Sequence, residues 1–405
     1  MTLLLMHPDH PGYEAARRVW NGMVDRRPRV IARCSSEADV VAAVRLARDL
    51  DLEIGVRCGG HNAAGFAVPE DGLMLDLGGL AGVRVDPERR RAWVGGGALL
   101  GALDIASQAH GLATTAGNVS HTGVGGLTLG GGMGWLARQH GLACDNVESY
   151  RVVTADGEVV VARRDEHPDL FWALRGGGGN FGVVTEFEFR LHPVGTRALA
   201  AEFTFDPSAD VMRRWRDLSR LAPREATFDA SFKNGDSLTL GFVWVGDPER
   251  GKLLLPAMAD LGAARSSTVT ELSYVELQTR DDSVQRHDVR RYSAGHYLPE
   301  LTDAAIDAFL AVDGDLRPNV GLQAYGGAIA DVPDEDAAFS FRGTEFEYGA
   351  GMSWTDPAED ADRMAAARRT AARLARTPRA CTSTRWPTRA RRACAGRTRR
   401  RSWRG

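Results

Sequence analysis

Apolar and polar positions in the first part of the chain alternate between the period of a strand and the period of a helix. Residues 28–31 are predicted to form a short strand. The segment 36–50 then carries apolar residues on one helical face, behind a serine N-cap at position 35 or 36, and 52–57 returns to a strand-like pattern. This order predicts a strand–helix–strand unit that ends in the turn 57–62.

Two groups of shorter elements follow this unit. The first group predicts three strands and a closing helix, at 73–77, 83–85, 92–94 and 98–110. The second group begins at Thr115 and predicts three strands and one short helix, at 149–154, 159–161, 183–191 and 169–174. The pattern therefore predicts two subdomains, 28–112 and 113–197, after an N-terminal segment 1–27.

The pattern changes at Leu199, where the alternating runs become longer and amphipathic helices separate them. Strands are predicted at 201–205, 227–232, 238–245, 320–329, 338–341 and 346–354, and helices at 211–221, 253–261, 304–311 and 357–374. Such an order is typical of an antiparallel sheet covered by helices on one face. We therefore expect an α+β domain over 198–375, followed by a basic tail, 376–405.

Composition narrows the class of protein. The chain has 405 residues, of which 43% are hydrophobic and 25% charged, as in ordinary globular proteins. Its five cysteines show neither a CxxC spacing nor a dense framework, so no metal site is expected. The opening residues lack a basic stretch, and no apolar run is long enough to cross a bilayer. The expected location is cytoplasmic, with no membrane partner.

The turn after the strand 52–57 carries the most unusual local sequence, Arg57-Cys58-Gly59-Gly60-His61-Asn62. Paired glycines allow positive φ and a close approach of the backbone to a ligand. Successive N–H groups in such a turn form a concavity that suits an anion such as a pyrophosphate. From these residues alone, a plain Gly-Gly turn with a surface histidine remains an equal alternative.

A second glycine motif excludes one class of cofactor. Gly177, Gly179 and Gly182 match the spacing GxGxxG. The dinucleotide fingerprint must follow a strand and open a helix, whereas this one follows a predicted helix and opens a strand. No Walker A sequence occurs either. Neither a nicotinamide-binding Rossmann domain nor a P-loop is therefore expected.

Four stretches together resemble the FAD-linked oxidases of the berberine bridge enzyme type. They are RCGGHN at 57–62, the glycine-rich segment 122–135, GLACDN at 141–146, and DLFWALRG at 169–176 continued through Val184. Their order and spacing match across roughly residues 13–193. The resemblance implies a two-part FAD-binding domain of the PCMH type, in the vanillyl-alcohol-oxidase class, over 28–197. It also implies a substrate domain over 198–375.

The resemblance further implies an activity and a set of cofactor-binding residues. The activity is an FAD-dependent oxidation of a C–H bond next to a hydroxyl or amine of a small molecule. The hydride would pass to flavin N5, and oxygen would then take the electrons from the reduced flavin. The cofactor itself would carry out the chemistry at carbon. The residues implied for FAD are Arg57, Cys58, Gly59, Gly60, His61, Asn62, Thr122, Gly123, Gly125, Gly126, Asn146, Gly182, Val183 and Val184.

Within this set, His61 matches the histidine that bonds covalently to the flavin 8α-methyl group. Many relatives add a second bond from a cysteine, but that position is Val119 here. A single covalent bond through His61 is therefore expected. Thr122 stands where a bulky residue is thought to hinder oxygen in some relatives, and its modest size allows an oxidase.

The catalytic base is not carried over, because the family's closing Tyr-x-Asn strand is absent from this sequence. Tyr325 and Tyr348, on predicted strands of the second domain, are the candidate active-site groups, with a core or rim position as the alternative. A tyrosine base would need its pKa, near 10 when unperturbed, to be lowered by nearby charge.

The tail does not fit the family. From Thr377 onward the chain holds ten arginines and no lysine or acid, with almost no hydrophobic periodicity. A GC-rich back-translation of this stretch, read one base earlier, yields a tyrosine- and asparagine-containing sequence of the expected kind. We therefore predict a frameshift near Arg376. Two alternatives follow: a remnant that binds FAD weakly or is inactive, and a basic arm that binds RNA, although no nucleic-acid partner is expected for the acidic body.

Overall fold

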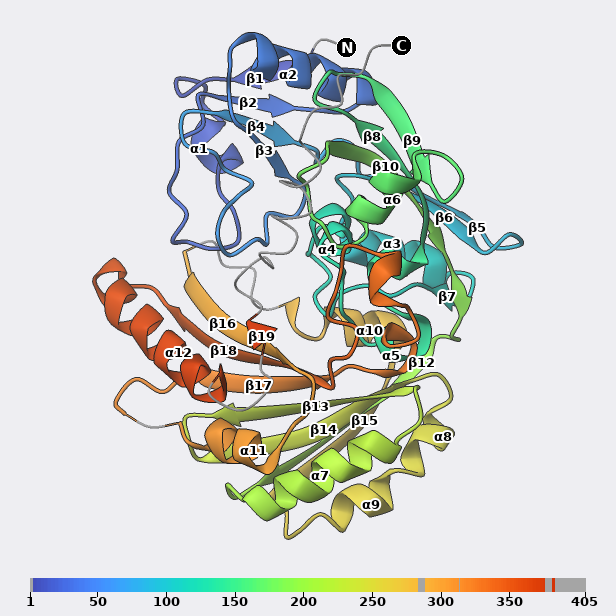
Figure 1. The fold of residues 1–405 in the computed structure, drawn as a ribbon, viewed down its shortest axis with the longest axis vertical. Helices are drawn as coiled ribbons and strands as arrows, with labels where there is room; N and C mark the ends of the chain where they lie inside the picture. The colour runs from blue at the N-terminus through green and yellow to red at the C-terminus, as the bar shows by residue number, and fades with distance from the viewer. Residues whose placement is uncertain (1–2, 283–287, 313, 376–380, 383–405) are drawn as a thin grey trace.

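The structure is a computed structural model, and it describes residues 3–282, 288–312, 314–375 and 381–382. It has three large sheets, of which the first two lie side by side above the third in Figure 1. Almost all of the predicted tail and the proposed site of the frameshift lie outside the described residues. The α+β class expected from the sequence is confirmed.

The first sheet has the strand order β1-β2-β4-β3. Its strands are β1 (Leu4–Met6), β2 (Val30–Arg33), β3 (Ile54–Arg57) and β4 (Leu73–Asp76). The short helix α1 (Tyr13–Ala16) precedes β2, and α2 (Glu37–Asp49) connects β2 to β3. Ser36 caps α2 by accepting a hydrogen bond from the Asp39 amide, which fixes where the helix begins. β3 therefore delivers its glycine turn at the end of the sheet.

The second sheet has the order β5-β6-β10-β8-β9 and is antiparallel throughout. Its strands are β5 (Val83–Asp86), β6 (Arg91–Gly95), β8 (Val147–Val153), β9 (Val159–Arg163) and β10 (Val183–Arg190). The pair β7 (Leu112–Ala113) and β11 (His192–Pro193) forms a separate small sheet. The helices of this region are α3 (Leu100–Gln108), α4 (Val124–Leu129), α5 (Ala137–His140) and α6 (Pro168–Leu174).

The third sheet has eight strands in the order β15-β12-β14-β13-β17-β18-β16-β19 and is antiparallel throughout. Its strands are β12 (Arg197–Phe205), β13 (Ala226–Lys233), β14 (Ser237–Val245), β15 (Ser266–Ser273), β16 (Arg290–Leu298), β17 (Asn319–Ala324), β18 (Phe346–Trp354) and β19 (Cys381–Thr382). The helices are α7 (Ala209–Leu221), α8 (Pro248–Lys252), α9 (Leu255–Ala259), α10 (Tyr274–Thr279), α11 (Asp303–Leu310) and α12 (Asp360–Ala375).

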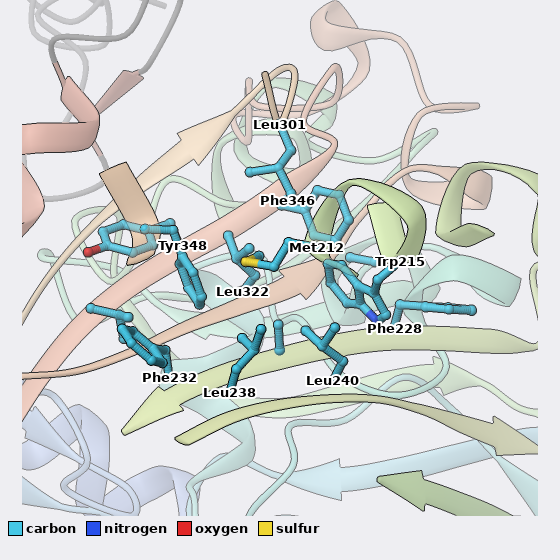
Figure 2. Packing of buried hydrophobic residues seen from close by; sticks show 14 of the residues in the cluster. Met212, Trp215, Phe228, Phe232, Leu238, Leu240, Leu301, Leu322, Phe346 and Tyr348 are labelled. Carbon is cyan, nitrogen blue, oxygen red and sulfur yellow. The ribbon is translucent and has the colours of Figure 1, made fainter. Parts of the chain in front are cut away.

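Helices α7, α11 and α12 cover the face of this sheet that points away from the first two sheets (Figure 1). Trp215 of α7, Phe309 of α11 and Leu374 of α12 join strand residues such as Phe232 and Tyr348 in one buried cluster (Figure 2). The opposite face therefore points toward the two upper subdomains, as the predicted one-sided arrangement requires.

Several predicted elements differ from the structure. The predicted helix 253–261 is shorter in the structure, as α9, which has Pro256 in its first turn, and α8 before it was not predicted. The predicted strand 320–329 stops at Ala324, where Gly326 and Gly327 take positive φ, and 338–341 has no regular structure. The glycine-rich segment 122–135, in which no helix was predicted, contains the six-residue α4. β1, β15 and β16 were not predicted, because short or polar strands lack a clear apolar period.

Helix α3, which follows β6 of the second sheet, packs on α10, which follows β15 of the third sheet, and a buried carboxyl lies between them. Gln278 donates a hydrogen bond of 3.1 Å to Asp104, which is 1% exposed. Burial raises the pKa of Asp104 to about 7, and the hydrogen bond from Gln278 opposes that shift only in part. Asp104 therefore remains largely protonated below neutral pH in the folded protein.

This predicts a pH-dependent gain from Asp104→Asn. The unfolded carboxyl releases its proton near pH 4 and the folded one near pH 7, so the wild type loses stability as pH rises between these values. The variant should gain on the order of 3 kcal/mol relative to wild type across that window. Urea unfolding at pH 5 and pH 8 measures it, with the exposed Asp9→Asn as control. A gain that is equal at both pH values would contradict the assignment.

Candidate flavin site

The turn that follows β3 meets the segment that precedes α4, and two glycines form the contact. A Cβ added to Gly59 would lie 2.4 Å from the amide nitrogen of Gly123, and one added to Gly123 would lie 2.3 Å from that of Gly59. No side chain fits at either position. Gly60 also has φ of +68°, which favours glycine. The two stretches predicted to hold the cofactor therefore touch each other through their backbones.

Cys58 packs into this contact. Its Sγ donates a hydrogen bond of 3.3 Å to the Ala98 carbonyl and lies against the backbone of Gly123. Burial raises the pKa of the Cys58 thiol. The structure thus gives this cysteine a packing role, since a neutral thiol is a poor nucleophile.

The ring of His61 is held on several sides. Trp20 stacks on it with ring centroids 5.0 Å apart and an interplanar angle of 12°. Nε2 of His61 lies 2.7 Å from Nδ1 of His121, and Nδ1 of His61 lies 3.4 Å from the Thr122 hydroxyl. The sequence analysis missed Trp20 and His121. The only sequence signal for His121 was its position directly before Thr122, which was predicted to contact the cofactor.

Arg57 lies at the base of the same turn. Its guanidinium donates to the Asp76 carboxylate at 2.8 Å and to the Arg18 carbonyl at 3.2 Å, and Asp76 is 1% exposed. Its Nε is buried without a partner in the described part of the chain. Arg57 therefore anchors the glycine turn to the end of β4.

The donors in these two stretches fit a pyrophosphate-containing cofactor. Within the described residues, the amides of Gly60 and Asn62 donate to no backbone carbonyl, and the same holds for Gly126 at the first turn of α4. A Cβ added to Gly126 would meet nothing within 4 Å, so this backbone borders open space. Open amides around such a space are what a phosphate anion requires.

Three further predicted cofactor residues lie at the start of β10, the central strand of the second sheet. Gly182 has φ of +140°, and a Cβ there would lie 2.7 Å from Val152 and Val153. Val183 and Val184 open β10 and are almost completely buried. Only the backbone of these three residues can reach a ligand, because the side chains of Val183 and Val184 pack into two hydrophobic cores.

The side chain of Asn146, another predicted cofactor residue, forms hydrogen bonds within the protein. Its side chain donates to the carbonyls of His140 and Leu142 at 3.0 and 2.9 Å, and its Oδ1 lies 2.7 Å from Nε2 of His192. His140 and His192 stack 3.8 Å apart, and burial lowers their pKa to about 4 and about 3. Asn146 therefore has its side chain occupied by the protein, and only its backbone is available to a ligand.

The two predicted tyrosines point to opposite faces of the third sheet. Tyr348 belongs to the helix-covered core, next to Phe309, and is 1% exposed. Tyr325, just beyond the end of β17, packs against Leu142 of the second subdomain, and Tyr297 and Met133 join the same cluster. Only Tyr325 therefore lies on the side that faces the cofactor-binding subdomains.

The Tyr325 hydroxyl donates a hydrogen bond of 2.8 Å to the side-chain carboxyl of Glu347. Glu347 lies opposite Tyr297 on the neighbouring strand, and burial raises its pKa. Burial and the negative charge of Glu347 raise the pKa of Tyr325 well above its ordinary value. A tyrosine base would need the opposite shift, so Glu347, which the sequence analysis missed, is the better proton acceptor. Because adjacent side chains of a strand point to opposite faces of the sheet, Glu347 and Tyr348 lie on different faces.

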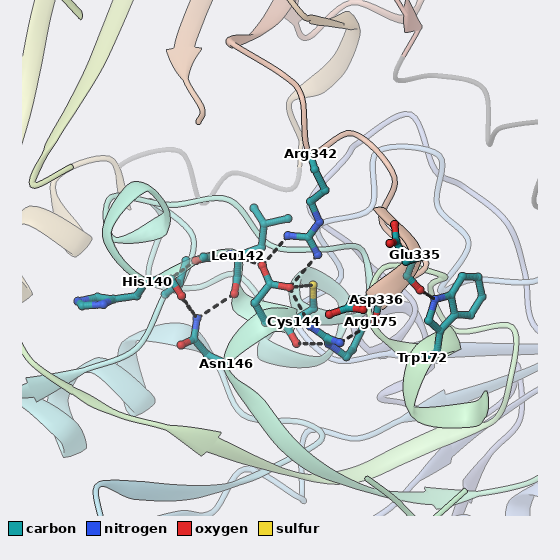
Figure 3. Close-up of polar contacts among 12 residues, drawn as sticks. His140, Leu142, Cys144, Asn146, Trp172, Arg175, Glu335, Asp336 and Arg342 are labelled. Atoms are coloured by element: carbon teal, nitrogen blue, oxygen red, sulfur yellow. Dashed lines mark hydrogen bonds and ion pairs between the residues drawn. The ribbon is translucent and has the colours of Figure 1, made fainter. Parts of the chain in front are cut away.

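A buried ion cluster fixes the sheet to the second subdomain (Figure 3). Asp145 accepts two hydrogen bonds from Arg342, at 2.6 and 2.7 Å, and one from Arg175 at 3.1 Å. All three side chains are at most 5% exposed. Arg175 also donates to the carbonyls of Cys144 and Asp336.

The loop that carries Arg342 also carries aromatic residues to the tyrosine pair. Phe339 donates its amide to the Arg175 carbonyl, and a Cβ at Gly176 would lie 2.5 Å from Phe339. Phe341 stacks on Tyr297 with centroids 4.4 Å apart. The ion cluster therefore positions one wall of the Tyr325–Glu347 site.

We expect Asp145→Asn to be strongly destabilising. The change leaves two buried guanidinium groups with one neutral acceptor, and breaking a buried ion pair costs about 3–5 kcal/mol. The control is Asp331→Asn, which disrupts the exposed pair with Arg224 and should cost at most about 1 kcal/mol. Urea unfolding of both variants measures the difference. Similar losses would show that the buried cluster has no special role.

Comparison with known proteins identifies the class. The model of a family described as FAD binding domain matches residues 28–163. Glucooligosaccharide oxidase of Sarocladium strictum is 32% identical over 365 residues, which cover 82% of this chain and 72% of that protein. (R)-6-hydroxynicotine oxidase of Paenarthrobacter nicotinovorans is 43% identical over 204 residues, but the match spans only 50% of this chain and 44% of that oxidase.

Solved structures share the whole arrangement. A glucooligosaccharide oxidase of Acremonium strictum, described as carrying 6-S-cysteinyl, 8α-N1-histidyl FAD, has a TM-score of 0.81 at 26% identity, covering 92% of this chain and 85% of that one. Berberine-bridge-enzyme-like protein 1 of Physcomitrella patens has a TM-score of 0.84 at 23% identity, covering 92% and 86%, and shows the shared fold.

The chain therefore belongs to the FAD-linked oxidoreductases of the berberine bridge enzyme type, as the sequence resemblance implied. It is an FAD-dependent oxidoreductase with a PCMH-type cofactor domain. In the described residues we find no helix of the length and apolarity needed to cross a membrane. The same part of the chain contains no group of His, Cys, Asp or Glu that could hold a metal ion.

Proposed function

We propose that this protein oxidises a C–H bond next to a hydroxyl or amine of a small molecule, with hydride transfer to flavin N5 and oxygen as the electron acceptor. The observation that carries the proposal is the Tyr325–Glu347 hydrogen bond on the sheet face that packs against the cofactor-binding subdomains. When bound, FAD would supply the hydride acceptor. The gluco-oligosaccharide and hydroxynicotine oxidases support this reaction class without fixing the substrate.

Glu347 takes the proton in this proposal. Removal of a hydride from the carbon of an alcohol or amine leaves a proton on its oxygen or nitrogen, which a base must accept. Burial moves the pKa of Glu347 upward from its ordinary value, toward the neutral range in which a general base works best. Tyr325 remains a neutral hydroxyl that donates to the Glu347 carboxylate and orients it.

Aromatic side chains define the surroundings of that carboxylate. Tyr297 meets the rings of Tyr325 and Phe339 edge to face, with centroids 5.8 and 6.0 Å apart. Phe341 and Met133 complete the same cluster. Such a wall suits the flat apolar surface of a ring-containing substrate.

Glu347→Gln should lower kcat about 10²-fold or more while leaving the FAD content unchanged, since a glutamine fills the same volume but cannot accept the proton. The assay is hydrogen peroxide release from a panel of alcohols and amines. Tyr348→Phe is the matched control, because it changes the neighbouring residue on the opposite face and removes a buried hydroxyl that has no partner among the described residues. Equal activity of the two variants would contradict the role of Glu347.

We also propose that FAD is attached covalently through His61 alone. The position that carries a cysteine in many relatives is Val119, and Cys58 is a half-buried thiol whose pKa is raised by desolvation. Denatured wild-type protein should therefore gain the mass of one FAD, and His61→Asn should lose that gain. Flavin on a peptide without His61 would overturn the assignment.

The same mass measurement separates this proposal from its alternative, a remnant that binds FAD weakly. A chain of the printed length that carries no flavin, and that remains colourless after incubation with FAD, would favour the remnant. Cytoplasmic location remains a prediction of the sequence.

A further inference from the structure

His121 has no role in the family resemblance, yet its ring lies directly against that of His61. Nδ1 of His121 is 2.7 Å from Nε2 of His61, and the ring centroids are 4.6 Å apart. A contact of this length between two imidazole nitrogens is a hydrogen bond, in which one nitrogen must be the donor and the other the acceptor.

The direction of that bond decides which atom of His61 can react. If Nε2 of His61 carries the hydrogen and donates it, Nδ1 of His61 keeps its lone pair. The Thr122 hydroxyl lies 3.4 Å from that Nδ1, on the side opposite His121. In that tautomer Nδ1 is the nucleophilic atom of His61, and Nδ1 of His121 accepts the hydrogen bond from Nε2.

The rest of the surroundings fixes the plane of the His61 ring. Trp20 stacks on it, and the guanidinium of Arg291 lies 4.2 Å from the centroid of the Trp20 ring. The amide of Trp20 donates to the Gly60 carbonyl at 3.1 Å. A strand residue of the third sheet thus supports the stack that orients His61.

The backbone around His121 is held without the help of its side chain. Ser120 donates from its amide, at 3.0 Å, and its hydroxyl to Asp282, and its carbonyl accepts from the Gly101 amide. The Thr122 carbonyl accepts from the Leu100 amide at 2.9 Å. Replacing the imidazole should therefore leave the backbone of this segment in place.

We propose that His121 is the positioning residue and proton acceptor for covalent attachment of FAD to His61. This inference rests on the attachment proposed above. Nδ1 of His61 forms a bond to the 8α-methyl carbon of FAD, one C–H bond of that methyl group breaks, and the Nε2 hydrogen of His61 passes to His121 as a proton. His121 would then release that proton, which would enter the flavin ring together with the proton of the broken C–H bond and two electrons. Dioxygen would remove both electrons and both protons as hydrogen peroxide, so that the covalent flavin ends oxidised.

The test compares His121→Gln with wild type, both produced in riboflavin-depleted cells and then incubated with FAD. Glutamine can accept the hydrogen bond of His61 but cannot take up a proton. The readout is the fraction of denatured chains that carry the mass of FAD, followed over time. We expect attachment about 10²-fold slower in the variant, with reversible FAD binding retained. His110→Gln, at an exposed histidine, is the matched control and should match wild type.

A second variant tests proton transfer itself. In His121→Gly, added imidazole should restore part of the attachment rate, whereas a residue that only supports the fold would show no such rescue. Attachment at wild-type rate in His121→Gln, or no rescue in His121→Gly, would overturn the role of His121 and leave the His61 bond standing. Loss of reversible FAD binding in both variants would assign His121 to folding and also overturn the proposal. Wild-type protein without covalent FAD would overturn the attachment and this inference together.

Discussion

The contact between Gly59 and Gly123 is the constraint on which the site depends. Each position would place a Cβ less than 2.5 Å from the other's amide nitrogen, so no other residue permits the two backbones to meet. One glycine follows a strand of the first sheet, and the other precedes a helix packed on the second. Their meeting sets the relative position of the two subdomains and places His61 beside Thr122 and His121. A flavin site made of two separate sequence stretches requires such a junction.

The third sheet contributes by keeping its two faces chemically different. Along β18, Phe346, Tyr348 and Ala350 enter the helix-covered core, whereas Glu347 points the other way. Burial on the helix side supplies most of the apolar area that stabilises the sheet, which leaves the other face free for polar groups. A carboxyl with a raised pKa and a neutral tyrosine can therefore be placed there at a tolerable cost in stability. The Asp145 cluster then holds this face against the cofactor-binding subdomains.

Sequence reasoning succeeded where local pattern determines structure. The strand–helix–strand unit, the glycine turn after β3 and the one-sided helical cover of the sheet all follow from periodicity and glycine placement. It missed β15 and β16, since Ser266–Ser273 is polar and largely exposed and Arg290–Leu298 interrupts its alternation with glycine and serine. It also predicted no helix in the glycine-rich segment 122–135, which contains the short α4.

Side-chain roles were harder to predict, because they depend on residues far apart in the chain. Nothing local distinguishes Tyr325 from Tyr348: both are tyrosines on or next to strands, and only the packing of Leu142 against one of them reveals which faces the cofactor. Glu347 resembled any polar residue of an alternating strand until the Tyr325 hydroxyl was found 2.8 Å from it. Trp20 and His121 were equally hard to predict, because they lie far apart in the sequence and meet only at the ring of His61. The sequence can therefore indicate where the flavin binds, whereas the groups that would move protons there emerge only from the assembled fold.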